Sequence, residues 1–180
     1  MRDAIVENPH SPHFDELSTL FNMFRISHLN RRYYAARLKS LKTWDTVLSA
    51  IVIAATASSF GVLAIDGVPH KTAIAAILAV IGFVASVVVP IFKLSIKIDD
   101  ASNKACAFHF AAQLLESALR FVRNSEGQDG EVAGWVRSGE EAYKLAGALP
   151  DTDAEDRKLI KKVEGEIDAS FPPNYIWHAL

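Results

Sequence analysis

Cysteine and charge are both scarce in this sequence. Its 180 residues contain one cysteine, Cys106, which excludes a disulfide-stapled scaffold and a cysteine-ligated zinc site. Charged residues make up 22% of the chain and hydrophobic residues 50%, so the chain is too apolar to be intrinsically disordered. A net charge of -2 argues against nucleic acid as the main partner. The length is that of a single domain.

Charge is almost missing from residues 46–92, where Asp66 and Lys71 are the only formally charged side chains. Residues 47–65 form an uncharged run of 19 residues, and residues 72–92 form one of 21. At a rise of ~1.5 Å per residue, either run reaches about 30 Å as a helix, which is the thickness of a bilayer core. The sequence therefore predicts two transmembrane helices joined by a short turn at residues 66–71.

Two other interpretations of the apolar runs agree less well with the sequence. A helical hairpin buried in a soluble bundle would need several amphipathic helices to cover it, and the rest of the chain is largely polar. A cleaved signal peptide fits poorly, because 45 mostly polar residues precede the first run. A membrane-spanning hairpin agrees better with the sequence.

Basic residues near the runs predict the orientation of the hairpin. Six lie between residues 25 and 42, three lie at 93, 97 and 104, and the turn contains only Lys71. The positive-inside rule then places both termini in the cytoplasm. We expect the following segments: a cytoplasmic amphipathic helix at 12–45, transmembrane helices at 46–65 and 72–92, an outer turn at 66–71, a cytoplasmic continuation helix at 93–123, and acidic distal helices with an aromatic tail at 124–180.

A heptad seam follows the second run, with apolar residues alternating at steps of three and four. It predicts that the helix of residues 72–92 continues unbroken into the cytoplasm and packs there against the amino-terminal helix, which begins near Ser11 and Pro12. The expected fold is all-α, with an antiparallel coiled-coil-like bundle next to the membrane hairpin. The seam consists of Ile91, Leu94, Ile98, Ala101, Ala105, Phe108, Ala112, Leu115, Leu119 and Val122.

Small and hydroxyl-bearing residues are frequent in the two runs. The pairs Ala57 with Gly61 and Gly82 with Ser86 have the small-x-x-x-small spacing that permits close helix crossing. Pro90 is a candidate hinge, since proline releases a helical hydrogen bond. A mildly polar stripe on one face of the first run is the candidate lining of a pore, although each hydroxyl could instead bond to its own helix. The stripe consists of Ser49, Thr56 and Ser59.

The distal part of the chain is acidic, whereas the amino-terminal part is basic. Residues 124–180 contain twelve acidic and six basic side chains, and residues 1–45 contain five and seven. The two regions are expected to dock by charge, within one chain or between subunits, unless the acidic residues simply form a solvated surface. The aromatic tail that begins at Phe171 is expected to pack against a cytoplasmic helix, either of another protomer or of the same chain.

Catalytic motifs are missing: the sequence has no phosphate-binding glycine loop, no metalloprotease helix and no nucleophile elbow. Cys106 and His109 lie three residues apart but lack a third orienting group, and His10 and His13 flank a proline at a helix start, so neither pair predicts catalysis or a metal site. No enzyme activity and no cofactor are expected. One basic segment is a candidate for contact with lipid headgroups or anions: Arg31, Arg32, Arg37, Lys39 and Lys42.

The basic-aromatic segment of residues 31–37, Arg-Arg-Tyr-Tyr-Ala-Ala-Arg, leads to Trp44 and two membrane runs with a very short turn. Over residues 12–123 this arrangement resembles the SLATT domains, the SMODS- and SLOG-associating two-transmembrane effectors of bacterial conflict systems. The resemblance implies an oligomeric effector in the bacterial inner membrane that permeabilises or depolarises the membrane. It also implies a trigger from a cytosolic sensor or a nucleotide-signalling partner.

Three functions compete at this point. The favoured one is an oligomeric pore-forming effector in antiviral defence, because two spans per chain are too few to enclose a channel. The alternative is a non-conducting membrane scaffold that positions a cytosolic partner through the distal helices. The third is a membrane-attached enzyme, for which the sequence offers no recognisable set of catalytic residues.

Overall fold

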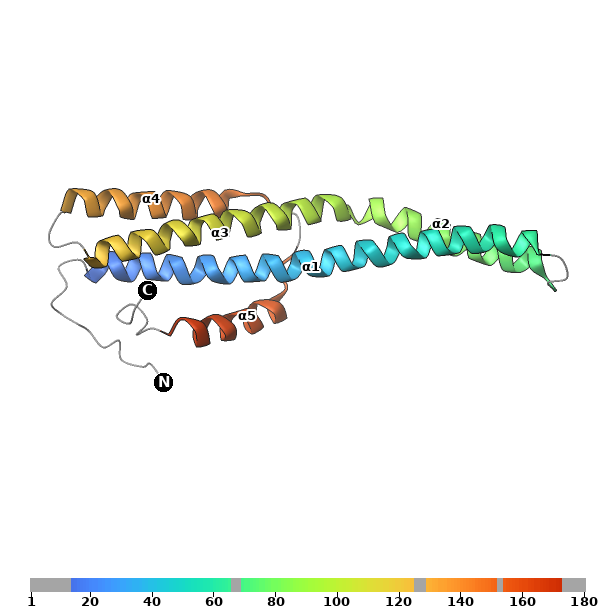
Figure 1. Cartoon of the computed structure of the whole chain (residues 1–180), viewed down its shortest axis with the longest axis horizontal. Helices are drawn as coiled ribbons and strands as arrows, with labels where there is room; N and C mark the ends of the chain where they lie inside the picture. The colour runs from blue at the N-terminus through green and yellow to red at the C-terminus, as the bar shows by residue number, and fades with distance from the viewer. Residues whose placement is uncertain (1–13, 66–68, 125–128, 152–153, 173–180) are drawn as a thin grey trace. The chain divides into compact units, whose positions relative to one another are not determined.

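The computed structural model describes residues 14–65, 69–124, 129–151 and 154–172, and these residues contain helices but no strand (Figure 1). The helices are α1 (Phe14–Ala64), α2 (Lys71–Ile91), α3 (Leu94–Asn124), α4 (Asp129–Ala148) and α5 (Arg157–Ser170). The all-α prediction is confirmed, and α1 and α2 are each long and apolar enough to cross a membrane. Several predicted features lie outside the described residues: the cap at Ser11 and Pro12, the pair His10 and His13, the centre of the 66–71 turn, and the tail after residue 172.

The chain divides into two compact units. The bundle unit comprises Met1–Ala36 and Asp100–Leu180, and the apolar unit comprises Arg37–Asp99. Helix α1 contributes its first half to the bundle unit and its second half to the apolar unit. The two units are described separately below.

The bundle unit has a core made by α1, α3 and α4. Leu20 and Leu115 are fully buried, and Gly139 of α4 lies so close to them that a Cβ there would come within 2.9 Å of Leu115 Cδ2 and 3.3 Å of Leu20 Cδ2. Glycine therefore allows α4 to approach the other two helices closely. The core cluster consists of Leu17, Leu20, Phe21, Phe24, Leu115, Ala118, Leu119, Val122 and Val132.

A second cluster joins the same helices to α5. Tyr34 stacks on Phe108 with ring centroids 6.0 Å apart, and Phe108 meets Tyr143 of α4 edge to face at 6.4 Å. Leu159 and Ile160 of α5 pack against this cluster. The aromatic side chains thus connect all four helices of the bundle unit.

Most of the predicted heptad seam is buried within the bundle unit. Ala101, Phe108, Ala112, Leu115, Leu119 and Val122 are all buried, whereas Ala105 is partly exposed. The buried face of α3 is wider than a two-position seam, since Ala111 and Ala118 are fully buried as well. The reason is that α3 packs against both α1 and α4, while a coiled-coil seam would face one helix.

The helix predicted to run unbroken through residues 72–123 is interrupted. Phe92 donates its backbone N–H to Val88 O at 3.0 Å, and Lys93 then adopts a left-handed φ of 49° before Lys97 N–H bonds to Lys93 O at 3.1 Å. Proline lacks an N–H, so the helix is already weakened at Pro90. The predicted hinge residue lies inside the last turn of α2, and the break itself falls two residues later.

Helix α5 has a defined amino-terminal cap. Asp156 caps α5, accepting hydrogen bonds from Lys158 N at 3.0 Å and Leu159 N at 3.1 Å. Such a cap satisfies two of the free N–H groups of the first turn. Helix α5 therefore starts at Arg157, directly after its cap.

Replacing Leu115 by alanine tests the bundle core. Because the side chain is fully buried between helices, we expect the free energy of unfolding to fall by about 2–5 kcal/mol. Phe110→Ala is the matched control on the same helix, since Phe110 is 60% exposed, and we expect a change below about 0.5 kcal/mol. Chemical denaturation followed by circular dichroism measures both, and equal losses for the two variants would contradict this packing.

Candidate functional site

The apolar unit turns its large side chains outward and its small ones inward. Where the second half of α1 meets α2, the buried residues are Ala55, Ala75, Gly82 and Ala85. Phe60 and Phe83, by contrast, are 70% and 69% exposed. Only 6% of the most apolar stretch of α1 and 17% of that of α2 is buried. An exposed apolar surface of this extent is typical of a membrane or protein contact.

Gly82 lies at the closest contact of these two helices. A Cβ on Gly82 would lie 3.2 Å from Ala55 Cβ and 3.8 Å from Thr56 Oγ1. Helix packing in lipid depends on small residues at such contacts, because they allow the backbones to approach. Of the four candidate packing residues, Gly82 alone takes part here. Ala57, Gly61 and Ser86 are exposed in the single chain, and a Cβ on Gly61 would meet no other atom within 4 Å.

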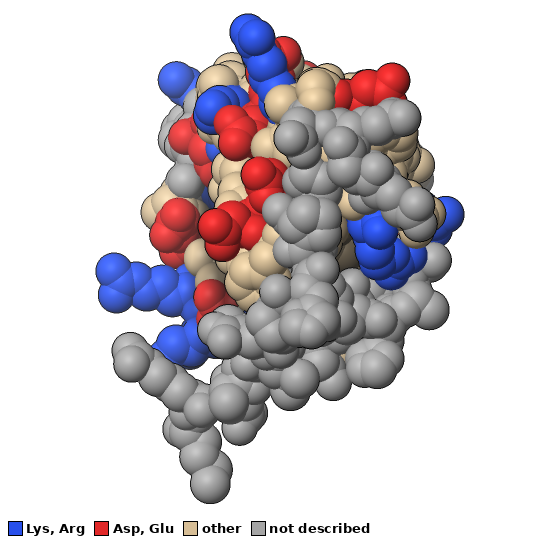
Figure 2. Space-filling view, turned by 90° about the vertical axis from the view of Figure 1, so that its left-hand side faces the viewer, with Lys and Arg blue, Asp and Glu red and all other residues tan. Residues whose placement is uncertain are grey.

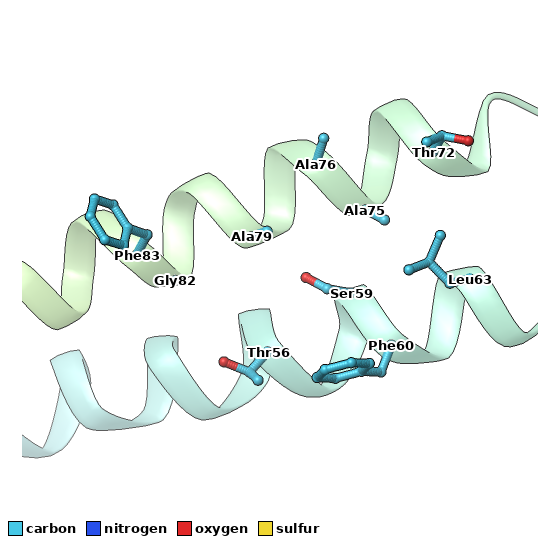
Figure 3. Close-up of a pocket in the computed structure, with 10 residues that line it drawn as sticks. All are labelled: Thr56, Ser59, Phe60, Leu63, Thr72, Ala75, Ala76, Ala79, Gly82 and Phe83. Carbon is cyan, nitrogen blue, oxygen red and sulfur yellow. The ribbon is translucent and has the colours of Figure 1, made fainter.

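An open groove of about 500 Å³ runs between the two helices (Figure 3). Figure 3 shows Ser59 and Leu63 of α1 pointing toward α2, with Ala75 and Ala79 on the facing side. The wall is mostly methyl and aromatic carbon. The lining residues are Thr56, Ser59, Phe60, Leu63, Thr72, Ala75, Ala76, Ala79, Gly82 and Phe83.

The hydroxyl groups of the predicted polar stripe bond to their own helix. Thr56 Oγ1 donates to Val52 O and Ser59 Oγ to Ala55 O, each at 2.7 Å. Both side chains line the groove, whereas Ser49 is exposed and does not. Because each hydroxyl donates its proton within the helix, only its oxygen lone pairs face the groove.

The five basic residues predicted to contact anions are shared between the units. Arg31 and Arg32 belong to the bundle unit, and Arg37, Lys39 and Lys42 belong to the apolar unit. Arg32 is engaged by α5, with Nη1 lying 3.9 Å from a carboxylate oxygen of Glu166. Lys39 and Lys42 are exposed.

A buried lysine holds the connection between α4 and α5. Lys104 of α3 is 7% exposed, and its Nζ lies 3.5 Å from Asp151 Oδ2 and 3.2 Å from Tyr34 Oη. The Tyr34 hydroxyl donates to the same Asp151 oxygen at 2.7 Å. One residue earlier on α1, the Tyr33 hydroxyl accepts the backbone N–H of Asp156 at 3.0 Å. We call Lys104, Tyr33, Tyr34, Asp151 and Asp156 the polar clasp.

Sequence reasoning missed the polar clasp. Lys104 counted only as one of the basic residues that predict orientation. Its position was informative, because it follows the buried Ala101 by three residues and precedes the buried Phe108 by four, which places it on the buried face of α3. The aspartates could not be assigned to it, since they lie in a connection without periodicity.

Acidic side chains of the distal helices behave in two ways. On α5, Asp168 pairs with Arg25 of α1, so docking by charge occurs within the chain. On α4, Glu140 and Glu141 pair instead with Lys144 and Arg137 of their own helix. Figure 2 shows acidic and basic side chains sharing one face of the molecule.

His28 lies beneath the end of α5. Its ring is 4.8 Å from the ring of Phe171 and 4.5 Å from that of Phe24, while Phe24 and Phe171 meet edge to face at 5.1 Å. Burial, followed by the charges of Arg31 and Arg32, lowers the pKa of His28 from 6.5 to about 4. Phe171, the first residue of the predicted aromatic tail, therefore packs against α1.

Candidate catalytic groups are not brought together in the described residues. Cys106 is exposed, and Nδ1 of His109 is buried without a hydrogen-bond partner there. No group of three or more metal-ligating side chains occurs among the residues that the structure describes.

Lys104→Met tests the polar clasp. Methionine keeps the apolar stem but leaves Asp151 and Tyr34 without the ammonium group, so we expect a loss of about 1–3 kcal/mol in the free energy of unfolding. Lys144→Met is the control, because its side chain is 71% exposed in an i,i+4 pair, and it should cost less than about 0.5 kcal/mol. Denaturation curves of the two variants give the comparison. A Lys104 loss no larger than that of Lys144 would refute a structural role of the clasp.

The pH dependence of stability tests the environment of His28. Its pKa is lower in the folded chain than in the unfolded one, so the unfolded state binds the proton first as the pH falls. We expect stability to decline from about pH 6.5 to about pH 4 and the His28→Gln variant to lose part of that decline. Glu116 and His109 of α3 also act on His28, with opposite signs, and both are retained in the variant. Identical pH profiles for the two proteins would show that His28 does not titrate in this range.

Comparison with protein-family models, curated proteins and solved structures finds no match to this chain. The resemblance to SLATT domains stays an expectation from the sequence.

Proposed function

We propose that the chain is an integral protein of the bacterial inner membrane that crosses it twice, through the second half of α1 and through α2. The observation that carries this proposal is the inverted packing of the apolar unit, with small residues between the helices and large apolar residues outside. In water such a surface is unfavourable by roughly 25 cal/mol per Å² of apolar area. In lipid it has no such cost, and two helices satisfy their backbone hydrogen bonds internally.

The orientation follows from the basic residues next to each proposed span, which favour a cytoplasmic location of both termini. Trp44 supports an interfacial position at the start of the first span, since it is 60% exposed. The bundle unit would then lie in the cytoplasm, with α1 and α3 packed as an antiparallel pair.

We further propose that several copies assemble into a pore that permeabilises the membrane. Two helices enclose no channel, so a pore needs walls from several chains. The groove beside Thr56 and Ser59 supplies the mildly polar surface that such a wall requires. The resemblance to SLATT domains agrees with an effector role in antiviral defence, triggered by a cytosolic sensor or a nucleotide-signalling partner.

One observation favours a second candidate function. The hydroxyl groups of Thr56 and Ser59 donate to carbonyl groups of their own helix, which leaves the groove largely apolar. A non-conducting scaffold that holds the bundle unit at the membrane, for a cytosolic partner to bind, needs no polar wall. The two candidates differ in conductance.

Reconstitution into liposomes distinguishes them. We expect wild-type protein, once an oligomer has been verified in the liposomes, to release a small encapsulated dye. Thr56→Val combined with Ser59→Ala should slow the release several-fold, because the groove loses two of its three hydroxyl groups and keeps only that of Thr72. Ser58→Ala is the control, since Ser58 is exposed and does not line the groove. Intact liposomes containing the assembled wild type would contradict the pore and favour the scaffold.

A further inference from the structure

Helix α5 docks along α1 through two buried aliphatic side chains and one aromatic. Val163 and Ile167, four residues apart, are 3% and 2% exposed. Beyond the end of the helix, Phe171 covers Phe24 and His28 of α1. Asp156 lies at Tyr33 and Asp168 at Arg25, so α5 runs antiparallel to α1. An amphipathic helix that fills a neighbouring face with apolar residues at such spacing is a common recognition mode.

Charge complementarity fixes the register of this contact. Arg25 of α1 pairs with Asp168, and Arg32, two turns later, pairs with Glu166 at 3.9 Å and donates to Ser170 Oγ at 3.5 Å. The arginine side chains are 26% and 39% exposed, and the carboxylate side chains 67% and 49%. The arginines are thus set into the surface of α1, while the carboxylates of α5 approach them from the solvent side.

The ion pair in the connection to α5 is more buried than the ion pairs of α5 itself. At the polar clasp, the side chain of Lys104 is 9% exposed and that of its partner Asp151 is 25% exposed. The ion pairs along α5 are much more open to water, where screening weakens them. The charged contacts of α5 are therefore weaker than that of its connection, and the attachment of α5 depends mainly on the buried Val163 and Ile167.

We infer that the α1 face around Arg25, His28 and Arg32 is a docking surface for an amphipathic helix of a partner protein with carboxylates near its C-terminal end, and that α5 occupies it as an internal ligand. The partner helix would have two aliphatic residues four apart, carboxylates that reach the two arginines, and an aromatic residue at its end. It binds by displacing α5, and charge complementarity identifies its chemistry. This inference concerns the bundle unit and stands whether or not the spans form a pore.

A peptide of residues 154–172 is the probe, because the structure shows how this segment fits the surface. The full chain carrying Glu166→Arg and Asp168→Arg repels its own α5 but keeps the surface intact. We expect it to bind the labelled peptide, and we expect the wild type to bind at least about tenfold more weakly, because its tethered α5 competes at a high effective concentration. Fluorescence anisotropy in detergent gives both affinities.

Reversing the surface tests its chemistry. The second variant is the full chain with Arg25→Glu and Arg32→Glu and a native α5, whose carboxylates the new glutamates repel. It should bind the native peptide at least about tenfold more weakly than the first variant does. It should instead bind a peptide carrying Glu166→Arg and Asp168→Arg. Arg137→Glu with Glu141→Arg, added to the first variant, is the matched control, since this exposed pair lies within α4 and should leave peptide binding unchanged.

Hydrogen exchange of α5 and α3 keeps the result interpretable. In the first variant α5 should lose protection while α3 retains it, which shows release without unfolding. In the wild type, α5 protection should fall as salt rises. The inference is overturned if α5 is released and the native peptide still fails to bind, or if α5 stays protected after its carboxylates are reversed.

Discussion

The apolar surface of two helices, which the chain itself does not cover, is the constraint on which the rest of the structure depends. Between the second half of α1 and α2, close contact is left to Ala55, Gly82 and other small residues, while phenylalanine, isoleucine and valine side chains are largely exposed. A soluble core has the opposite arrangement, because water drives large apolar residues inward. The proposed membrane location explains this arrangement, because lipid accommodates exposed apolar side chains. The two candidate functions differ in whether the groove between the helices lines a pore.

The bundle unit has a gradient of stability that follows burial. Its core is fully buried around Leu20 and Leu115, and the polar clasp at Lys104 is nearly so. The ion pairs along α5 lie open to solvent, with Asp168 67% exposed. Exposed pairs contribute about 0–1 kcal/mol each, whereas removal of the Lys104 ammonium group from the clasp is expected to cost about 1–3 kcal/mol. The charged contacts of α5 are therefore the part of the bundle unit most sensitive to salt, whereas Val163 and Ile167 are buried.

The basic residues of α1 illustrate how one feature serves two purposes. As a group they predict orientation, since positive charge is retained on the cytoplasmic side. Individually, Arg25 and Arg32 bind the carboxylates of α5, and Arg31 and Arg32 help to keep His28 neutral. A count of charges cannot separate these roles, because the partner of each arginine lies more than 130 residues away in the sequence.

The sequence by itself determined the all-α class, two helices long and apolar enough to span a membrane, and most of the buried seam on α3, because hydrophobic periodicity and run length report local structure directly. It did not reveal the break at Phe92 and Lys93, which a single left-handed residue produces after Pro90. It also did not reveal the polar clasp, the close approach at Gly139, or which small residues of the spans touch one another. Those features depend on contacts between segments distant in the chain, and only the tertiary structure decided them.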